Sequence, residues 1–303
     1  KLFDIYNDYD GINNIKTIND NAGIQPVEVD PVIIEMLEEA KYFYDLSNGE
    51  FDVTIGALLH VWHNYREEGI TLNTNGEKGN VPTLDELENA SINKGWNHVL
   101  IDTEKNTVYI DDTHISLDVG GIAKGFATEK IAQSLESEGI TTGAINAGGN
   151  NRTLGQKYDG SAWRVGIQNP KGSDSILVVN MDGKCSFVTS GDYERYYEAT
   201  DGNKYHHIID PETLFPATNF HSVSIITEDS GVADCLSTTL FTLSYEEGLK
   251  VLDTYRKEHP DTFIEAIWIM DEDKDIDTEY KHITNNQLIV YSEGLKDKLT
   301  WVD

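Results

Sequence analysis

The stretch Asp118-Val-Gly-Gly-Ile-Ala-Lys-Gly125 says most about this chain, because in it a predicted strand ends, glycines follow and a helix begins. The first turn of a helix has unpaired N–H groups and partial positive charge, both of which favour a phosphate. Gly120 and Gly121 let a ligand approach the backbone closely, and Lys124 adds a positive charge. Asp118 stands where a carboxylate can bind a ribose or a ring N–H. The pattern fits a tight strand-to-helix turn without a ligand as well.

The sequence on either side of this turn predicts short strands and an amphipathic helix. Residues 98–118 read as a meander of three short strands, the last of them Ile115–Asp118. A helix is expected over 122–137, with its inward face formed by Ile122, Phe126, Ile131 and Leu135. A buried strand is expected at Ala144–Ala147, ending at Gly148-Gly149.

Further toward the N-terminus, apolar residues at helical spacing predict a helix over 31–46. Residues 66–82 are polar and Gly-rich, which is typical of an exposed loop. Thr83-Leu-Asp-Glu86 matches a capping box, so a short helix is expected to start there.

The C-terminal half alternates strands and helices. Residues 163–210 read as successive strands, with hairpin turns predicted at Asp182-Gly183 and Asp201-Gly202. The expected elements that follow are a strand at 222–227, helices at 232–242 and 246–256, and a strand at 263–270. Meandering strands mixed with helices predict an α+β fold with mixed or antiparallel sheets and helices packed on them.

Composition limits the kind of ligand. The net charge is −30, from 23 Lys and Arg against 53 Asp and Glu, which excludes nucleic-acid binding because a phosphate backbone needs a positive face. An anion can bind only where N–H groups, a Lys or a metal reverse the local field. No apolar run is long enough to span a membrane. The two cysteines, Cys185 and Cys235, are expected to be inert thiols.

Ala233-Asp-Cys-Leu-Ser-Thr238 contains a candidate pair of metal ligands. On a helix, Asp234 and Thr238 share one face and offer two hard oxygens, which suits Mg²⁺ completed by water and phosphate. The alternative is an Asp near a helix N-terminus and a Thr that bonds back to a carbonyl.

Three further segments combine polar residues with apolar strands. In Tyr205-His-His-Ile-Ile-Asp-Pro211, a strand would direct His206 and His207 to opposite sides, so one of them can act as a base. Asp52 lies in an apolar run, where either a cap or a ligand would satisfy it. The small residues and glycine of Thr189-Ser-Gly-Asp-Tyr193 suggest that another group approaches the backbone closely there. The alternative is a plain loop.

Taken in order, these segments resemble the ApbE-type flavin transferases, FAD:protein FMN transferases. The matching stretches span most of the chain and include Tyr6 and Ile18-Asn19; the others are Phe51–Gly56, Asp118–Gly125, Thr189–Tyr193, His206–Pro211 and Ala233–Thr238. Thr213-Leu-Phe-Pro216 departs from the family's Thr-Gly-Tyr-Pro, so the turn after Pro211 is expected to differ.

The resemblance implies one T-fold-like α+β domain over residues 1–303, made of two packed halves with the site between them. It implies FAD as substrate, Mg²⁺ as cofactor, and transfer of FMN to a Thr or Ser hydroxyl of an acceptor with an Asp-Gly-Ala-Ser/Thr-x-Thr type motif, with release of AMP. The residues implied for the flavin nucleotide are Tyr6, Glu50, Phe51, Asp52, Asp118, Lys124 and Ile209. Those implied for the metal are Gly121 and Ser237 through backbone oxygens, and Asp234 and Thr238 through side chains. His207 is the candidate base, with His206 as the alternate.

Two other functions fit the same residues: hydrolysis of FAD to FMN and AMP, and flavin binding without catalysis. The resemblance also implies a location outside the cytoplasm, in a lipoprotein whose lipid anchor would be its one contact with a membrane. The chain opens without a Met, so we expect a trimmed or mature form.

Overall fold

The computed structural model of the protein describes residues 1–302, which form two compact units. Unit 1 comprises Lys1–Ala123 and Glu194–Pro216; unit 2 comprises Lys124–Tyr193 and the chain from Ala217 onward. Both units contain helices and antiparallel sheets, which confirms the α+β class. The expectation of one domain made of two halves stays a prediction.

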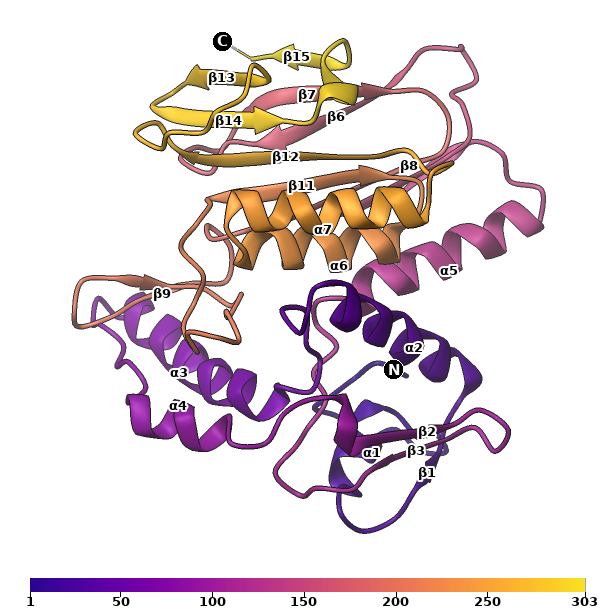
Figure 1. Cartoon of the computed structure of the whole chain (residues 1–303), viewed down its shortest axis with the longest axis vertical. Helices are drawn as coiled ribbons and strands as arrows, with labels where there is room; N and C mark the ends of the chain where they lie inside the picture. The colour runs from indigo at the N-terminus through magenta and orange to yellow at the C-terminus, as the bar shows by residue number, and fades with distance from the viewer. Residues whose placement is uncertain (303) are drawn as a thin grey trace. The chain divides into compact units, whose positions relative to one another are not determined.

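Unit 1 is built from helices and two small sheets (Figure 1). Its three-stranded sheet has the antiparallel order β1-β3-β2, and β9 and β10 form the hairpin predicted at Asp201-Gly202. The elements are α1 (Ile15–Asp20), β1 (Val27–Glu28), α2 (Pro31–Leu46), α3 (Gly56–Thr74), α4 (Leu84–Ala90), the 3-10 turn η1 (Trp96–His98), β2 (Val99–Asp102), β3 (Thr107–Ile110), β9 (Tyr197–Glu198) and β10 (Lys204–Tyr205).

Two helix starts in unit 1 follow from their caps. The Asp30 carboxylate accepts a hydrogen bond from the Val32 N–H, and α2 has the expected bounds. Thr83 and Glu86 form the predicted capping box: each side chain accepts from the other's backbone N–H.

The exposed loop predicted over 66–82 is wrong for its first half, because α3 continues to Thr74. Gly69 does not end the helix. A Cβ at this position would lie 2.3 Å from a ring carbon of Tyr197, so glycine allows the helix to pack against β9. The helix therefore packs closely against a residue more than a hundred positions away in the sequence.

Ile115–Asp118 is not the third strand of a meander. Only one isolated bridge forms there, between Ser116 and Ile55. The Asn19 carboxamide instead bonds both backbone groups of Leu117, at 2.9 Å to its carbonyl and 2.7 Å from its N–H. A side chain thus replaces a neighbouring strand.

Unit 2 is layered, with helices on one face of a seven-stranded antiparallel sheet and a three-stranded sheet on the other (Figure 1). The strand orders are β13-β14-β12-β11-β8-β5-β4 and β15-β7-β6. The elements are α5 (Ala123–Ser137), β4 (Gly143–Ala147), β5 (Asn150–Leu154), β6 (Trp163–Gln168), β7 (Ser175–Met181), β8 (Cys185–Gly191), β11 (Ser222–Thr227), α6 (Ser230–Thr242), α7 (Tyr245–Glu258), β12 (Ile264–Asp271), β13 (Lys281–Thr284), β14 (Gln287–Tyr291), the 3-10 turn η2 (Glu293–Leu295) and β15 (Leu299–Trp301).

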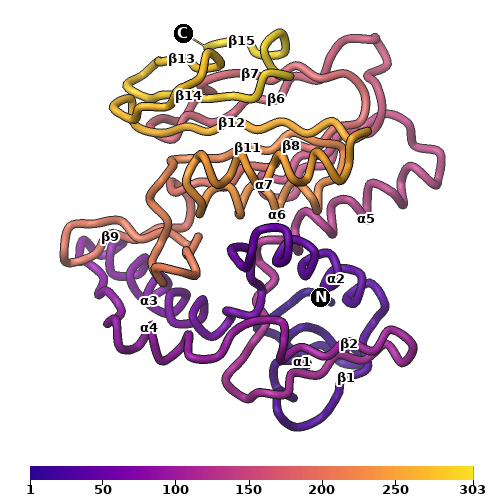
Figure 2. The backbone as a smooth tube through the Cα atoms, in the orientation of Figure 1, coloured from indigo at the N-terminus to yellow at the C-terminus, as the bar shows by residue number. Residues whose placement is uncertain are grey.

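The predicted strands at 222–227 and 263–270 and both predicted helices are present as β11, β12, α6 and α7. Figure 2 shows α6 and α7 running side by side along β11 and β12. The core of the unit lies between its two sheets and includes Leu177 and Val179 from β7 and Phe187, Ile226 and Ile267 from the larger sheet.

Two strand predictions in unit 2 are wrong. Asp182-Gly183 does not close a hairpin, because β7 and β8 belong to different sheets. Ala144–Ala147 is not buried: β4 is an edge strand that pairs with β5 alone, and its residues alternate between half-buried and exposed.

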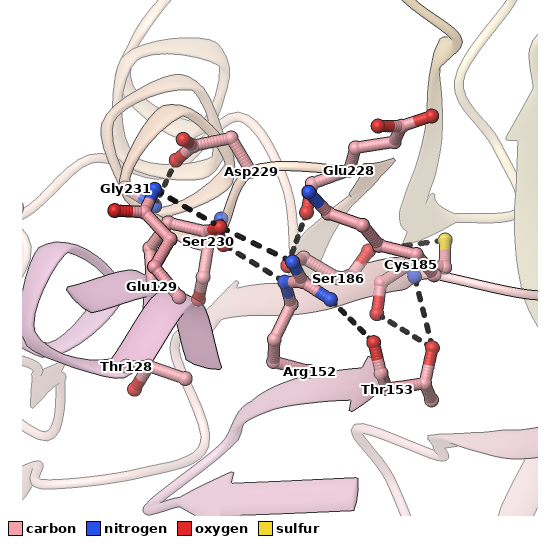
Figure 3. Close-up of polar contacts among 12 residues, drawn as sticks. Thr128, Glu129, Arg152, Thr153, Cys185, Ser186, Glu228, Asp229, Ser230 and Gly231 are labelled. Carbon is pink, nitrogen blue, oxygen red and sulfur yellow. Dashed lines mark hydrogen bonds and ion pairs between the residues drawn. The ribbon is translucent and has the colours of Figure 1, made fainter. Parts of the chain in front are cut away.

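The inward face predicted for α5 is wrong in part. Ile131 is 52% exposed and Glu129 is buried in its place. The cause is a fully buried partner, Arg152 of β5, whose guanidinium contacts the Glu129 carboxylate at 2.8 and 3.1 Å (Figure 3). That carboxylate also accepts the N–H of Ser230, so it joins α5 to the first turn of α6.

Among residues 1–302, no helix is both long and apolar enough to cross a membrane. Cys185 and Cys235 are buried and form no disulfide within that range. Burial raises the pKa of the Cys185 thiol to about 12, as expected for an inert thiol.

Candidate functional site

The Asp118–Gly125 segment divides between the two units after Ala123. In unit 1, the Asp118 carboxylate accepts the Gly120 N–H at 2.8 Å, and the Asp118 N–H donates to the Val53 carbonyl at 2.8 Å. The first bond shapes the turn. The second places this turn beside the Phe51–Gly56 segment.

Three basic side chains, one histidine and two arginines, lie near the Asp118 carboxyl. Burial raises its pKa, and the charges of His63, Arg66 and Arg195 oppose that rise. A carboxylate with a shifted pKa beside cationic groups is typical of a functional site. The sequence analysis did not predict these three residues. The signal that could have revealed them is the presence of two arginines close to the matched segments in a chain with few Lys and Arg residues.

Asp52, in the Phe51–Gly56 segment, is a second carboxyl whose pKa is shifted by burial. Its carboxylate accepts the Thr54 N–H at 2.8 Å and the Thr54 hydroxyl at 2.7 Å, and burial raises its pKa. Lys94 lowers that pKa and also donates to the Pro211 carbonyl at 2.8 Å. Lys94, which sequence reasoning missed, therefore connects the Asp52 segment with the end of the His206–Pro211 segment.

The other residues predicted for the flavin nucleotide lie in unit 1, apart from Lys124. Tyr6 is 47% exposed and stacks on His63 at 4.8 Å between ring centroids, whereas Glu50 is half-buried. Phe51 and Ile209 are buried side chains of the core, so they can contribute to a ligand site through backbone groups and by fixing its walls.

The two histidines do not alternate on a strand as predicted, because β10 ends at Tyr205. His206 is buried, and its Nδ1 accepts the Ile208 N–H at 3.2 Å. His207 lies in a bend and is half-buried. The Asp210 carboxylate forms the predicted turn by accepting the N–H groups of Glu212 and Thr213.

Leu214 stands in the turn where the family pattern has glycine. Its φ of 67° is in the left-handed region that favours glycine. Its N–H bonds to the Asp210 carbonyl at 2.9 Å, and its carbonyl accepts from the Trp62 indole at 2.8 Å. These contacts hold the leucine in a glycine-like backbone conformation.

In unit 2, α6 carries Asp234 and Thr238 one turn apart, as predicted. Asp234 is buried, and Thr238 is half-buried. The hydroxyls of Ser237, Thr239 and Thr242 each donate to a carbonyl of the preceding turn, but the Thr238 hydroxyl makes no hydrogen bond within residues 1–302. The alternative in which Thr238 bonds back to the helix therefore does not hold, and its oxygen is available to a ligand.

α5 presents Lys124 and Gly125 to Asp234. The ammonium of Lys124 lies 3.3 Å from one carboxylate oxygen, and the Gly125 N–H donates to the other at 2.8 Å. Burial raises the pKa of Asp234; Lys124, the Gly125 N–H and the Asn150 side chain lower it. A Cβ on Gly125 would lie 2.1 Å from the Ser230 carbonyl oxygen, so only glycine permits this contact between helices.

The Thr189–Tyr193 segment lies at the end of β8 beside α6. The Ser190 and Ser237 hydroxyls are 2.9 Å apart. Asp192 bonds Nδ1 of His221 at 2.8 Å, and Asp271 bonds Nε2 at 3.1 Å, which raises the pKa of the imidazole. The segment is therefore held in place by the Ser190 hydroxyl and by the Asp192 carboxylate.

Of the predicted metal ligands, Asp234, Ser237 and Thr238 share α6, and Gly121 precedes α5 in unit 1. Residues 1–302 contain no cluster of three His, Cys, Asp or Glu side chains that suits a metal. A cation on Asp234 would therefore take hydroxyl, carbonyl, water or phosphate oxygens, which is the shell that Mg²⁺ accepts.

Comparison with known proteins shows which family the chain belongs to. The model of the ApbE family matches residues 1–263. The FAD:protein FMN transferase of Treponema pallidum is 37% identical over 78% of this chain and 67% of its own length; that of Vibrio cholerae is 31% identical over 80% and 70%.

Solved structures give the same result for the fold. The ApbE protein of Thermotoga maritima superposes with a TM-score of 0.70 at 35% identity, covering 84% of this chain and 78% of that protein. The flavin transferase ApbE of Vibrio cholerae gives 0.74 at 26% identity, covering 98% and 85%. The expected T-fold-like ApbE architecture is therefore confirmed, and the chain belongs to the ApbE family.

Proposed function

We propose that this ApbE-family enzyme is a Mg²⁺-dependent FAD:protein FMN transferase, which attaches FMN to a Ser or Thr hydroxyl of an acceptor protein and releases AMP. The observation that carries the proposal is the arrangement on α6: a buried Asp234 carboxylate, and one turn later a Thr238 hydroxyl with no partner in residues 1–302. The names of the relatives supply the reaction class.

Asp234 and Thr238 would hold Mg²⁺, with backbone oxygens of Gly121 and Ser237. When bound, the ion offsets the charge of the pyrophosphate and of the leaving group. Lys124, whose ammonium lies 3.3 Å from an Asp234 oxygen, would add a second positive charge beside the ion and would suit a phosphate oxygen. That role matters in a chain of net charge −30, whose field opposes a polyanionic substrate.

The flavin nucleotide would lie against unit 1 residues. Tyr6 offers an exposed ring, and Asp118 and Asp52 offer carboxylates to ribose or ring N–H groups. Glu50, Phe51 and Ile209 complete this set. Arg66 and Arg195, which face Asp118, add positive charge near a bound anion.

The transfer forms a bond between the acceptor oxygen and the FMN-side phosphorus, and the bond from that phosphorus to the bridging oxygen breaks. AMP leaves with the electron pair. His207 accepts the hydroxyl proton, and His206 is the alternate. We favour His207 because it is half-buried, whereas the Nδ1 atom of buried His206 already accepts the Ile208 N–H.

The test incubates the protein with FAD, Mg²⁺ and an acceptor that carries the Asp-Gly-Ala-Ser/Thr-x-Thr motif, then measures flavin fluorescence of the acceptor in a denaturing gel. The control acceptor has Ala at the modified position. We expect fluorescence only with the intact acceptor and Mg²⁺. AMP and free FMN without labelled acceptor would indicate FAD hydrolysis, and FAD binding without any product would indicate a non-catalytic flavin-binding protein.

A further inference from the structure

Strand β4 forms one end of the seven-stranded sheet, and its outer edge has no partner strand. It pairs with β5 alone, from Gly143 opposite Leu154 to Ala147 opposite Asn150, without a bulge. Within residues 1–302, the residues of β4 make no further hydrogen bond. In an antiparallel strand the backbone groups of successive residues point alternately to the two sides. One row of N–H and C=O groups on β4 therefore faces away from the sheet.

This edge lacks the protection that exposed edges usually carry. Natural edge strands are blunted by charged residues, proline or a bulge, because an open edge pairs readily with another chain. β13, at the opposite end of the same sheet, follows this rule: it contains Lys281 and comes after the largely acidic stretch 271–279. Residues 140–151, around β4, include neither a charge nor a proline, although 25% of the chain is charged. Such an edge is suited to bind a partner strand.

β8 and α6 show which part of the site lies near this edge, because they run side by side in the same direction. Near their starts, the Ser186 hydroxyl donates to the Glu228 carbonyl at 3.2 Å. Further along, the Ser190 and Ser237 hydroxyls lie 2.9 Å apart. Asp234 lies between these two contacts on the helix, so it is level with the middle of β8.

β5 brings the end of β4 to the same level. It is antiparallel to β8, with Asn151 opposite Phe187, so the residue that precedes Asn151 is level with the middle of β8 and hence with Asp234. β4 reaches β5 through the Gly148-Gly149 turn, where both glycines are exposed and an added Cβ would meet nothing within 4 Å. The open edge of β4 therefore ends at an uncrowded turn, level with the proposed metal ligand.

Charge decides between the partners that could add to this edge. A second copy of the chain would bring another net charge of −30 to the contact, and this repulsion opposes pairing of β4 with itself. A substrate segment whose motif contains an Asp meets the least repulsion at an uncharged strand, where main-chain hydrogen bonds can bind it.

We propose that the acceptor protein binds as an added strand at β4, which directs its Ser or Thr hydroxyl toward the phosphate site at Asp234. This inference rests on the proposed function and deepens it by assigning the surface that recognises the acceptor.

The first test measures hydrogen–deuterium exchange of backbone amides by mass spectrometry, at saturating FAD and Mg²⁺. The acceptor carries Ala at the modified position, so that the complex accumulates without turnover. We expect the acceptor to slow exchange of the outward-facing amides of β4 roughly tenfold, because each gains a backbone hydrogen bond. The β13 edge, at the other end of the sheet, is the internal control and should exchange at an unchanged rate.

Proline substitution tests the same edge through activity. Ala144 and Ile145 are neighbours, so their N–H groups point to opposite sides, and proline at the outward one removes a donor that is not bonded to β5. That variant should keep its urea midpoint and its affinity for FAD but raise the KM for the acceptor roughly tenfold. His282→Pro and Ile283→Pro in β13 are the matched controls and should leave this KM unchanged.

The outcomes separate this inference from the proposed function. If the intact acceptor is labelled with FMN but exchange in β4 does not change, the inference is overturned and FMN transfer stands. Equal slowing at β13 also overturns it, as does slowing that needs no acceptor and grows with protein concentration, because a second copy then occupies the edge. An acceptor that protects β4 but is never labelled would contradict FMN transfer alone, and an acceptor that does neither would overturn both proposals.

Discussion

Gly125 lies at the contact between α5 and α6. Of the residues in the Asp118–Gly125 segment, it is the one whose substitution should change the free energy of unfolding most clearly. We consider Gly125→Ala, which adds one methyl group. Its Cβ would lie 2.1 Å from the Ser230 carbonyl oxygen and 2.5 Å from the Asp234 Cβ, and neither atom is the far end of a flexible side chain. The two helices must therefore move apart, by about 1 Å if ordinary van der Waals separation is to be restored.

Three contributions set the magnitude. Overpacking of a close contact costs about 1–3 kcal/mol. Separation of the helices stretches the 2.8 Å bond from the Gly125 N–H to Asp234, and loss of a hydrogen bond to a charged group costs about 1.5–3 kcal/mol. Alanine gains about 1 kcal/mol over glycine in helix propensity. We expect a net loss of about 3 kcal/mol in the free energy of unfolding.

The assay is urea denaturation monitored by circular dichroism, with Gly248→Ala as the matched control. Gly248 is a buried glycine of α7 in the same unit, and its added Cβ would meet Leu240 at an ordinary 3.4 Å. The control should be neutral or up to about 1 kcal/mol more stable. The reasoning is refuted if Gly125→Ala is as stable as the unmodified chain, or if both variants lose the same amount.

Two other predictions concern charges in unit 2. Arg152→Met should destabilise the protein by about 3–5 kcal/mol in urea because it leaves the Glu129 carboxylate buried without its partner, and adding Glu129→Gln should restore part of that loss; a loss under about 1 kcal/mol would contradict the role given to this pair. The raised pKa of His221 means that its stabilisation is complete below the unfolded pKa, about 6.5, and is lost as pH rises through the folded value. The stability difference between the unmodified chain and His221→Gln should therefore shrink from pH 6 to pH 9 in a series of urea titrations, and a difference that grows with pH would show the sign to be wrong.

Local signals in the sequence predicted elements where local physics decides them. The Thr83 capping box and the apolar stripe of α2 need only nearby residues, and both elements appear with the expected starts. The inward face of α5 could not be predicted, because Glu129 is buried only through Arg152, which lies 23 positions away in the sequence. The close contact of Gly69 in α3 with the ring of Tyr197 likewise joins residues that are far apart in the sequence.

In the candidate site, too, features set by local spacing could be predicted, and features set by contacts between distant elements could not. The i, i+4 spacing of Asp234 and Thr238 predicted that they share a helix face, and they do. That Gly125 serves helix contact, and that Asn150 faces Asp234, depends on how α5, α6 and β5 meet. No spacing in the sequence encodes those contacts.

The most direct test of the account measures AMP and FMN-labelled acceptor together in one reaction with FAD. Mass spectrometry of the acceptor and chromatography of AMP would be compared for the unmodified chain with Mg²⁺, the same chain with EDTA, and Asp234→Asn with Mg²⁺. We predict equal amounts of AMP and labelled acceptor in the first reaction and neither product in the other two. Labelling at the unmodified rate in EDTA or in Asp234→Asn would contradict the metal site, and no labelled acceptor in the first reaction would contradict FMN transfer itself.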